Sequence, residues 1–411
     1  MISSRYLLLL SGSLSLCACG SSQSQSPPSR IAVIEAIKHL PAQVSKADEP
    51  LYKREYQSPG PYPVPDLVPY AGPRKPIKNI ILMIGDGMGP AQVTGGLLAN
   101  HGRLFMQQAQ ATGFSITQNE YGKITDSAAS ATAMATGHKT YNAAIGVDSL
   151  GHEFRSIMWD AREHGKSTGM VVACELTDAT PACFAVTHPN RNDQEAIAAK
   201  YLSAPIDFMY AGGLRYFTQR QDHADLLPQW RQKGYQVVTK PSDIATITGP
   251  KAVALLAENG PPAVAERTAA YINQGVDKAL EVLSKNDKGF FLMIEGSQID
   301  DAGHFNNATQ NVQEVLDFDQ QVGKAFRFAA ANGETLVIVT ADHETGGYSI
   351  VGGSSTSGKI AANFATNKHS AVMVPVFAYG VGSELFTGMY ENTEIYYRIK
   401  KALGWNTVEN N

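Results

Sequence analysis

Residues 79–89 read Asn-Ile-Ile-Leu-Met-Ile-Gly-Asp-Gly-Met-Gly. The apolar run is short and continuous, which is typical of a strand that is buried on both faces of a parallel sheet. Asp86 follows the apolar run after a single glycine, Gly85. The stretch therefore predicts a buried strand over 79–84 that ends in a carboxylate.

Other short apolar runs alternate with helical patterns along the chain. They predict strands at 168–173, 207–211, 290–294, 335–340 and 374–379. The helical patterns lie at 90–99, 127–136, 156–164, 192–203, 263–285, 311–331 and 393–403. Such alternation implies an α/β fold in which a mostly parallel central sheet carries helices on both faces, as a three-layer sandwich.

Length and composition describe an ordinary globular enzyme. The chain has 411 residues, of which 43% are hydrophobic and 18% are charged, so it can bury a core without cross-links. It carries 34 basic and 38 acidic residues, and no segment concentrates Lys and Arg into a run. This balance argues against a nucleic-acid partner or a polybasic membrane contact.

The first residues predict an export signal instead of a part of the fold. The stretch 6–19 is rich in Leu, Ser, Ala and Cys and is too short to span a bilayer. The sequence Leu16-Cys17-Ala18-Cys19 resembles a bacterial lipobox, which implies a lipoprotein signal peptide over 1–18 and a lipid on Cys19. An ordinary cleaved signal without lipid is the alternative. We expect an exported, periplasmic protein that is anchored to the membrane.

A tether and an N-terminal extension are expected over 19–76. Residues 20–29 are rich in Ser, Gln and Pro, which suits a flexible tether. Apolar residues spaced along 31–40 predict a short helix, and the proline-rich stretch 58–65 is expected to run extended. The catalytic domain is then predicted over 77–411.

Two cysteines, Cys174 and Cys183, remain within this domain. Cys174 ends an apolar strand and Cys183 stands in an apolar helix start, which favours two buried thiols. Export leaves a disulfide between them open as the alternative.

Carboxylates and imidazoles follow several predicted strands at the point where each strand ends. In a parallel sheet these ends meet at one edge, where ligands bind. Burying several carboxylates together without a cation is costly, so the pattern predicts a metal cluster. Mixed Asp and His sets suit zinc, whereas oxygen-only sets suit magnesium. The residues are Asp86, Asp178, Thr180, Glu295, Asp300, His304, Asp342 and His343.

A candidate nucleophile begins the predicted helix over 127–136. Asp126 is a natural N-cap, so Ser127 falls in the first turn, where free backbone N–H groups and the helix dipole favour a phosphate. No Gly-x-Ser-x-Gly motif surrounds Ser127, so the serine-hydrolase alternative loses support.

Several motifs, in order along residues 77–403, resemble the alkaline phosphatase family, and above all its short bacterial members. Few residues separate His343 from His369, which leaves little room for the large insertion of longer relatives. The motifs are Gly85–Gly89, Thr125–Ala128, Asp178–Pro181 with Arg191, Glu295–Asp300 with His304, Thr340–Glu344, and His369.

The resemblance implies a phosphomonoester hydrolase that holds two zinc ions and one magnesium ion. Ser127 would attack phosphorus and form a phosphoserine, while Arg191, oriented by Asp178, would grip two phosphate oxygens. The first zinc would be bound by Asp300, His304 and His369. The second zinc would be bound by Asp86, Asp342 and His343. The magnesium would be bound by Asp86, Thr180 and Glu295.

Two alternatives remain: a phosphodiesterase or sulfatase of the same superfamily, and a non-catalytic surface lipoprotein that binds metal or phosphate. The expected substrates are small phosphate monoesters, and nucleic acid is not expected as a structural partner. Family resemblance implies a homodimer, with the segment before Ile77 as a candidate contact. Asp301, next to Asp300, departs from the pattern of the alkaline phosphatase family, whose members commonly carry Lys, His or Trp at this position. We expect its charge to weaken phosphate binding.

Overall fold

The computed structural model describes residues 53–249, 251–267 and 271–405. The predicted signal peptide over 1–18, the lipid acceptor Cys19, the tether at 20–29 and the helix at 31–40 lie outside the described residues. Within the described ranges, the search for a helix with the length and apolar character of a membrane span finds none.

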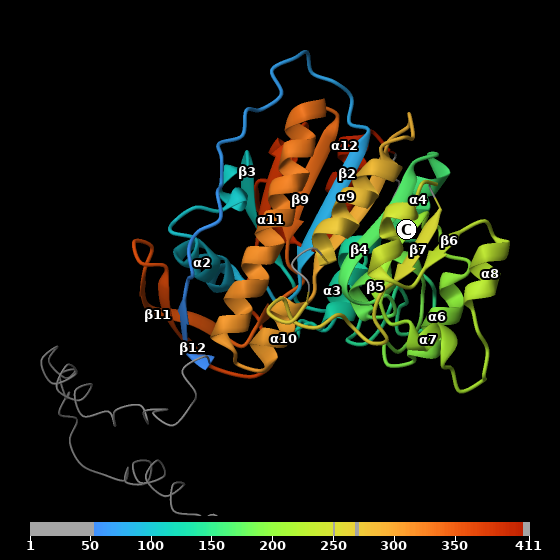
Figure 1. Cartoon of the computed structure of the whole chain (residues 1–411), viewed down its shortest axis with the longest axis horizontal. Coiled ribbons are helices and arrows are strands. Elements are labelled where there is room, and N and C mark those ends of the chain that lie inside the picture. Colours follow the sequence, from blue (N-terminus) through green and yellow to red (C-terminus); the bar gives the residue numbers. More distant parts are fainter. Residues whose placement is uncertain (1–52, 250, 268–270, 406–411) are drawn as a thin grey trace, which may run out of the picture. The chain divides into compact units, whose positions relative to one another are not determined.

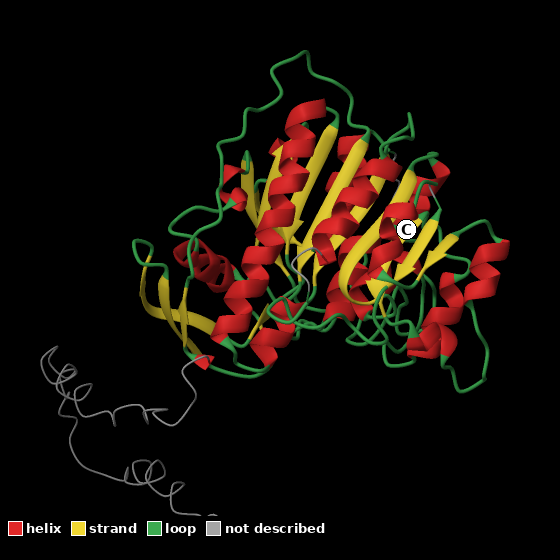
Figure 2. Cartoon of the chain, in the orientation of Figure 1, coloured by secondary structure: helices red, strands yellow, loops and turns green. Residues whose placement is uncertain are grey.

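A ten-stranded sheet forms the centre of the described structure (Figure 1, Figure 2). Its order is β15-β3-β14-β9-β2-β8-β4-β5-β7-β6. Strand β14 runs antiparallel to both of its neighbours, and the other neighbouring pairs are parallel. The strands are β2 (Asn79–Gly85), β3 (Ala111–Ile116), β4 (Ser167–Glu175), β5 (Phe208–Gly212), β6 (Gln236–Val238), β7 (Ala252–Leu255), β8 (Phe290–Gly296), β9 (Thr335–Thr340), β14 (Val374–Gly380) and β15 (Gly388–Glu391).

The side chains of β2 show why a continuous apolar run suits this sheet. Ile80, Leu82 and Ile84 pack into a core with helices α3, α4, α5, α6 and α12. Ile81 and Met83 point to the other face, into a core with α9 and α11. Figure 1 shows α9 and α11 lying along this second face. Every residue of β2 is buried, and the predicted three-layer α/β fold is confirmed.

The α-helices lie close to the predicted ranges where the apolar spacing is regular. They are α2 (Pro90–Ala99), α3 (Ser127–Thr136), α4 (Ile157–Glu163), α5 (Ala179–Ala185), α6 (Gln194–Tyr201), α7 (Arg215–Thr218), α8 (Leu227–Gln232), α9 (Tyr271–Leu283), α10 (Gln298–His304), α11 (Ala308–Asn332) and α12 (Thr393–Leu403). Short 3₁₀ helices lie at Phe105–Gln108, Pro241–Thr246 and Ser383–Phe386.

The helix predicted over 263–285 is wrong at its start. Residues 263–267 form a turn, which tertiary contacts hold against α11. The N–H of Val264 donates to Glu314 at 2.7 Å, and the buried guanidinium of Arg267 pairs with Glu314 and with Asp317 at 2.9 and 2.6 Å. These side-chain contacts hold the turn against α11, while the N–H of Arg267 donates to the carbonyl of Ala263 at 2.9 Å within the turn.

Two small sheets lie outside the central one. One has the order β1-β12-β11 and the other pairs β10 with β13. Their strands are β1 (Glu55–Gln57), β10 (Glu344–Thr345), β11 (Tyr348–Ser354), β12 (Lys359–Phe364) and β13 (His369–Ser370). The short interval between His343 and His369 therefore holds only a hairpin and these paired ends.

The described part of the N-terminal extension lies on the catalytic domain. Residues 58–65 contain neither helix nor strand, and the hydroxyl of Tyr62 donates to the buried carboxylate of Asp319. Residues 53–76 belong to the same compact unit as the residues after Ile77. The boundary at 76/77 stays a prediction.

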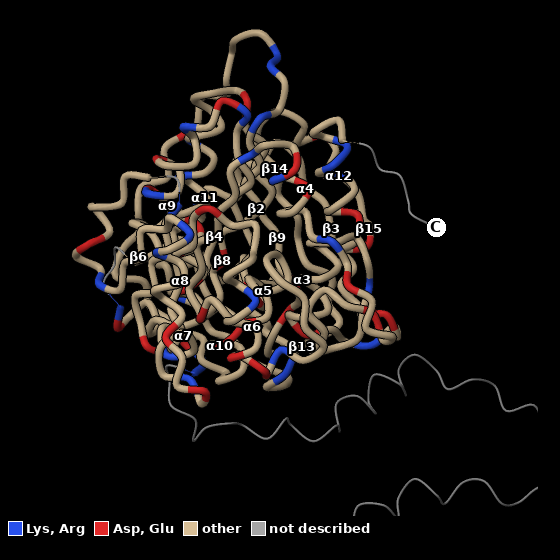
Figure 3. The backbone as a smooth tube through the Cα atoms, turned by 90° about the vertical axis from the view of Figure 1, so that its right-hand side faces the viewer, with Lys and Arg blue, Asp and Glu red and all other residues tan. Residues whose placement is uncertain are grey.

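Basic and acidic residues are interspersed along the backbone drawn in Figure 3, as the absence of a basic run predicts. Cys174 and Cys183 are both buried and free, so the interpretation as two thiols is confirmed.

Candidate active site

Ser127 is the first residue of α3 and is only 3% exposed. The side chain of Asp126 caps the helix by accepting a hydrogen bond from the N–H of Ala129 at 3.0 Å. Gly137 ends α3 with φ 78°, a conformation that glycine adopts without strain. The Ser127 hydroxyl thus lies at the positive end of a helix dipole, 3.3 Å from Nε2 of His343.

Two groups of potential metal ligands lie near Ser127. The group nearer to solvent, called the outer set below, consists of Asp300, His304 and His369, and its ligand atoms converge. Nε2 of His304 lies 3.1 Å from one oxygen of Asp300, and Nε2 of His369 lies 3.6 Å from the other. The two Nε2 atoms are 3.2 Å apart. Strand pairing brings His369 to this position, because β13 sets it opposite Thr345 of β10.

The backbone determines which nitrogen of each outer-set histidine faces inward. Nδ1 of His304 is 2.8 Å from the carbonyl oxygen of Asn367, and Nδ1 of His369 is 2.8 Å from that of Thr125. A carbonyl only accepts, so each Nδ1 carries the proton, and in the neutral rings each Nε2 is a lone pair. Two lone pairs at this separation repel unless a cation lies between them.

The inner set, Asp86, Asp342 and His343, is more deeply buried and its ligand atoms also converge. Nε2 of His343 lies 3.1 Å from Oδ2 of Asp342 and 3.5 Å from Oδ1 of Asp86. Neither carboxylate oxygen accepts a hydrogen bond from any group in the described part of the chain.

Thr345 sets the protonation of the inner histidine. Its hydroxyl donates to Asp300, so the same oxygen accepts from Nδ1–H of His343 at 3.1 Å. Nε2 of His343 then presents a lone pair to two carboxylates. Three acceptors pointing at one another form an arrangement that a cation satisfies.

Electrostatic effects differ between the two sets. In the inner set, burial and the charges of Asp342 and Asp300 raise the pKa of Asp86 well above its ordinary value, and burial with Asp300 raises the pKa of Asp342 to about 6. Burial lowers the pKa of His343. In the outer set, the hydrogen bond to Asp300 raises the pKa of His304 to about 9. Burial opposes ionisation of Asp300, yet its histidine neighbours outweigh burial and lower its pKa.

The predicted magnesium ligands lie beside the inner set. Oγ1 of Thr180 is 3.5 Å from Oδ2 of Asp86. Glu295 ends β8, whose register places it opposite Ile84 of β2, and its carboxylate is fully buried beside the thiol of Cys174. Burial, followed by the charge of Asp178, raises the pKa of Glu295 well above its ordinary value. An oxygen-only set of this kind is suited to a hard cation.

Arg191 approaches the serine from the side of α5. Its Nη2 lies 2.9 Å from Asp178, and its Nη1 lies 3.4 Å from the second oxygen of Asp126. Asp178 is thus placed to orient the guanidinium, as expected, and Asp126 does so as well. The sequence predicts Asp126 only as a helix cap, and nothing local marked its second contact. Thr345 was missed for the same reason.

Asp301 follows Asp300 on α10 and its side chain is exposed. Partial desolvation and the charge of Asp300 nevertheless raise the pKa of its carboxyl to about 6, and its effect on phosphate stays a prediction.

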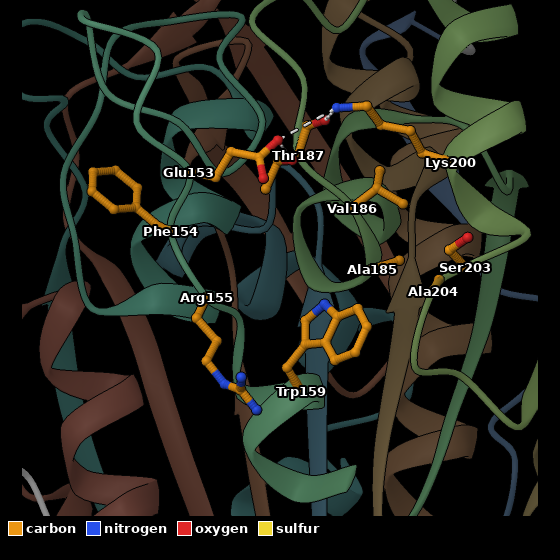
Figure 4. Close-up of a pocket in the computed structure, with 10 residues that line it drawn as sticks. All are labelled: Glu153, Phe154, Arg155, Trp159, Ala185, Val186, Thr187, Lys200, Ser203 and Ala204. Carbon is orange, nitrogen blue, oxygen red and sulfur yellow. Dashed lines mark hydrogen bonds and ion pairs between the residues drawn. The ribbon is translucent and has the colours of Figure 1, made fainter. Parts of the chain in front are cut away.

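A pocket of about 540 Å³, shown in Figure 4, contains none of the predicted site residues. Thr187 and Lys200 both contact the carboxylate of Glu153 there, at 2.5 and 3.6 Å. The segment that follows Thr187 carries Arg191, whose N–H donates to the carbonyl of Ala143 at 2.9 Å. The contacts in this pocket thus support the backbone that positions the arginine.

The fold and the site define a class: α/β proteins with a serine at a helix N-terminus beside convergent carboxylates and imidazoles at the carboxyl edge of a sheet. Comparison with known proteins narrows this class. The family model for alkaline phosphatase matches residues 77–363. The chain belongs to the alkaline phosphatase family, and the predicted enzyme class, a phosphomonoester hydrolase, is confirmed.

Similarity to individual alkaline phosphatases agrees with this family assignment. Alkaline phosphatase 4 of Bacillus subtilis is 37% identical over 291 residues, which cover 67% of this chain and 63% of that protein. The solved alkaline phosphatase of the Antarctic bacterium TAB5 is 40% identical with a TM-score of 0.77, over 81% of this chain and 100% of that one. A mutant of the TAB5 enzyme, 39% identical with a TM-score of 0.76 over 82% and 100% of the two chains, holds Mg in its M3 site.

Proposed function

We propose that this chain hydrolyses small phosphate monoesters through a phosphoserine on Ser127, with two zinc ions and one magnesium ion bound at the sets described above. The observation that carries the proposal is the convergence of acceptor atoms. The outer set turns the Nε2 atoms of two imidazoles toward each other beside Asp300, and the inner set faces one imidazole lone pair toward two carboxylates, 3.3 Å from the Ser127 hydroxyl.

The residues present fit the proposed metals. Asp86 Oδ1 and Asp342 Oδ2 are buried oxygens that accept no hydrogen bond among the described groups, which is costly unless a cation lies beside them. Asp300, His304 and His369 would hold one zinc, and Asp86, Asp342 and His343 the other. Asp86, Thr180 and Glu295 would hold magnesium. When bound, these cations supply Lewis-acid stabilisation of charge on the nucleophile and on the leaving oxygen.

The residues of the chain account for the remaining chemistry. Ser127 Oγ gives its proton to solvent and forms a bond to phosphorus, while the bond from phosphorus to the alcohol oxygen breaks and that oxygen takes a proton from solvent. Water then attacks phosphorus, the bond from phosphorus to Ser127 Oγ breaks, and the serine hydroxyl is restored as inorganic phosphate is released. The first turn of α3 stabilises negative charge on the phosphoryl oxygens.

Arg191 favours monoesters over the alternatives. Its fork, oriented by Asp178 and Asp126, offers two parallel N–H donors to two non-bridging oxygens. A monoester dianion has three non-bridging oxygens and two negative charges, whereas a diester has two non-bridging oxygens and one negative charge, so the guanidinium attracts the monoester more strongly. This supports a monoesterase over a phosphodiesterase. The absence of a Cys/Ser-x-Pro-x-Arg context after Ser127 disfavours a sulfatase.

Location and assembly are part of the proposal. We infer from the lipobox-like sequence that Cys19 is lipidated after removal of 1–18, and that the protein is periplasmic and anchored to a membrane. A homodimer is proposed from family resemblance alone. The Cys19→Ser variant should move from the detergent phase to the aqueous phase, and an unmodified N-terminus by intact mass of the wild type would contradict the anchor.

Turnover of 4-nitrophenyl phosphate beside bis(4-nitrophenyl) phosphate and 4-nitrophenyl sulfate tests the function. We expect kcat/KM for the monoester to exceed both others by at least about 100-fold, because the diester and the sulfate each carry one negative charge fewer, and weakening of charge-assisted hydrogen bonds costs about 1.5–3 kcal/mol per bond. A preference for the diester or the sulfate would favour an alternative, and no turnover of any substrate with zinc and magnesium supplied would favour the non-catalytic protein.

A further inference from the structure

A second pocket, of about 530 Å³, lies at the same edge of the sheet as the site. Its walls include Ile116, Gln118, Ile124, Asn142 and Ala371. Strand β14 runs antiparallel to both β3 and β9, so β3 is parallel to β9 and ends at the edge where β9 meets Asp342. The loop that follows Ile116 therefore starts beside the inner set. The volume falls in the range of small-molecule sites.

The walls of this pocket are held in place by specific contacts. Nζ of Lys139 donates to the carbonyl of Gln118 at 2.6 Å and lies 2.9 Å from a carboxylate oxygen of Glu391 on β15. The amide of Asn142 donates to the carbonyl of Ile124 at 3.1 Å, and its oxygen accepts from Asn119 at 2.9 Å. The shape of the pocket is thus largely preformed.

Residues that line the pocket are neighbours, along the chain or by hydrogen bonds, of residues in the candidate site. Ile124 precedes Thr125, whose carbonyl oxygen receives Nδ1–H of His369. Ala371 follows His369 by two positions, and the oxygen of Asn142 accepts from the N–H of Asp126 at 3.3 Å. One wall therefore borders the nucleophile and another borders the outer set.

The geometry of in-line displacement indicates on which side of phosphorus the alcohol portion of the substrate lies. The attacking and leaving oxygens lie on opposite sides of phosphorus. Because Ser127 Oγ contacts His343 of the inner set, the leaving oxygen faces the outer set, which contains His369. The group bonded to that oxygen then emerges beside the segment from His369 to Val372.

Apolar side chains are exposed at this position. Ile124, which lines the pocket, is 46% exposed, and Val372, which follows the lining residue Ala371 in the chain, is 47% exposed. Most side chains of this size and character are buried in the described structure. An exposed apolar surface next to a reacting centre is typical of a substrate contact.

We propose that this pocket is the subsite for the alcohol portion of the substrate and that it selects monoesters with a flat apolar group, such as aryl phosphates. Ile124 and Ala371 are the specificity-determining residues. The proposal rests on the proposed function and names its substrate class.

The test compares 2-naphthyl phosphate with glycerol 2-phosphate in the metal-loaded protein. Ile124→Ser should lower kcat/KM for the naphthyl ester about 3- to 10-fold, since the loss of a few apolar methylene contacts has effects of this order. The value for glycerol 2-phosphate should stay within about twofold. Ala371→Leu, which narrows the pocket without adding polarity, should show the same selectivity and serves if Ile124→Ser does not fold.

Two controls separate the pocket from the catalytic machinery. The inhibition constant of inorganic phosphate should be unchanged in both variants, because phosphate alone does not reach the pocket. Val351→Ser, on the exposed face of the β11 hairpin, should leave both substrates unaffected. Equal losses for both esters, or no loss for either, would overturn the subsite. No turnover of either ester by the wild type would overturn the proposed function itself.

Discussion

The inner and outer sets contain the same kinds of residue, yet they differ in how they balance charge. The side chains of Asp342 and His343 are 0% exposed, whereas His304 is 37% exposed. In the outer set, a raised pKa of His304 and a lowered pKa of Asp300 describe an ion pair that is balanced without further charge. In the inner set, the carboxyl pKa values are raised and that of His343 is lowered, so its charges are not balanced.

This difference shows that burial and the number of carboxylates together decide how strongly a set depends on a cation. Water and protons can satisfy the outer set. In the inner set, Oδ1 of Asp86 and Oδ2 of Asp342 accept no hydrogen bond from the described residues, although Oδ1 of Asp342 accepts from the N–H groups of Gly87 and His343. We therefore expect the nucleophile and the strongest metal dependence at the inner set, and exchange with solvent at the outer set.

The largest effect is expected at the residue that contacts the inner set. Ser127→Ala should abolish phosphoserine formation and reduce monoesterase kcat by at least about 10³-fold, because the covalent route is lost. Labelling with ³²P-phosphate measures the first effect. Ser130→Ala, a buried serine on the same helix whose hydroxyl bonds the carbonyl of Asp342, is the matched control for folding. Label recovered on the Ser127→Ala protein would contradict the role.

Metal removal tests the difference between the sets directly. Exhaustive chelation should abolish activity and lower the melting temperature, since a ligand at about 100 times its Kd stabilises by about 2.7 kcal/mol. Asp342→Asn relieves repulsion in the metal-free inner set. It should therefore reduce the metal-dependent temperature shift more than Asp300→Asn does. Calorimetry with and without zinc measures both shifts, and an equal reduction would contradict the comparison.

A smaller effect is expected at the arginine, which lies beside the metal sets. Arg191→Ala should lower kcat/KM for a monoester more than for a diester, because each charge-assisted hydrogen bond contributes about 1.5–3 kcal/mol. Arg191→Lys, which keeps the charge and loses the fork, should recover part of the loss. Equal losses for both substrates would show that the guanidinium does not grip two phosphate oxygens.

The smallest effect is expected at Asp301, whose side chain is exposed. Two unit charges about 6 Å apart at an effective dielectric constant of about 20 interact by about 3 kcal/mol before screening, and the exposure of Asp301 reduces this considerably. Asp301→Lys should tighten inhibition by inorganic phosphate by less than about tenfold. Inhibition constants at low and high salt measure the effect. No tightening would mean that the side chain points away from bound phosphate.

Prediction from sequence succeeded where a local pattern is sufficient. The apolar run at 79–84 specified a strand buried on both faces, and the alanine-rich run after Asp126 specified a capped helix with Ser127 at its start. It failed at 263–267, where the buried pairs of Arg267 with Glu314 and Asp317 hold a turn. It also missed β3, whose residues alternate between buried and exposed along a short stretch at the side of the sheet.

Local sequence was enough to predict the type of most elements and the kind of side chain at each strand end, because these depend on residues that are neighbours along the chain. The family resemblance grouped Asp300, His304 and His369, and the tertiary structure brings their ligand atoms together. The contact of Asp126 with Arg191, and the backbone carbonyls that turn Nε2 of His304 and of His369 toward each other, could be seen only in the folded chain. Those contacts depend on sheet register and strand pairing between distant segments, and on burial that no single segment specifies.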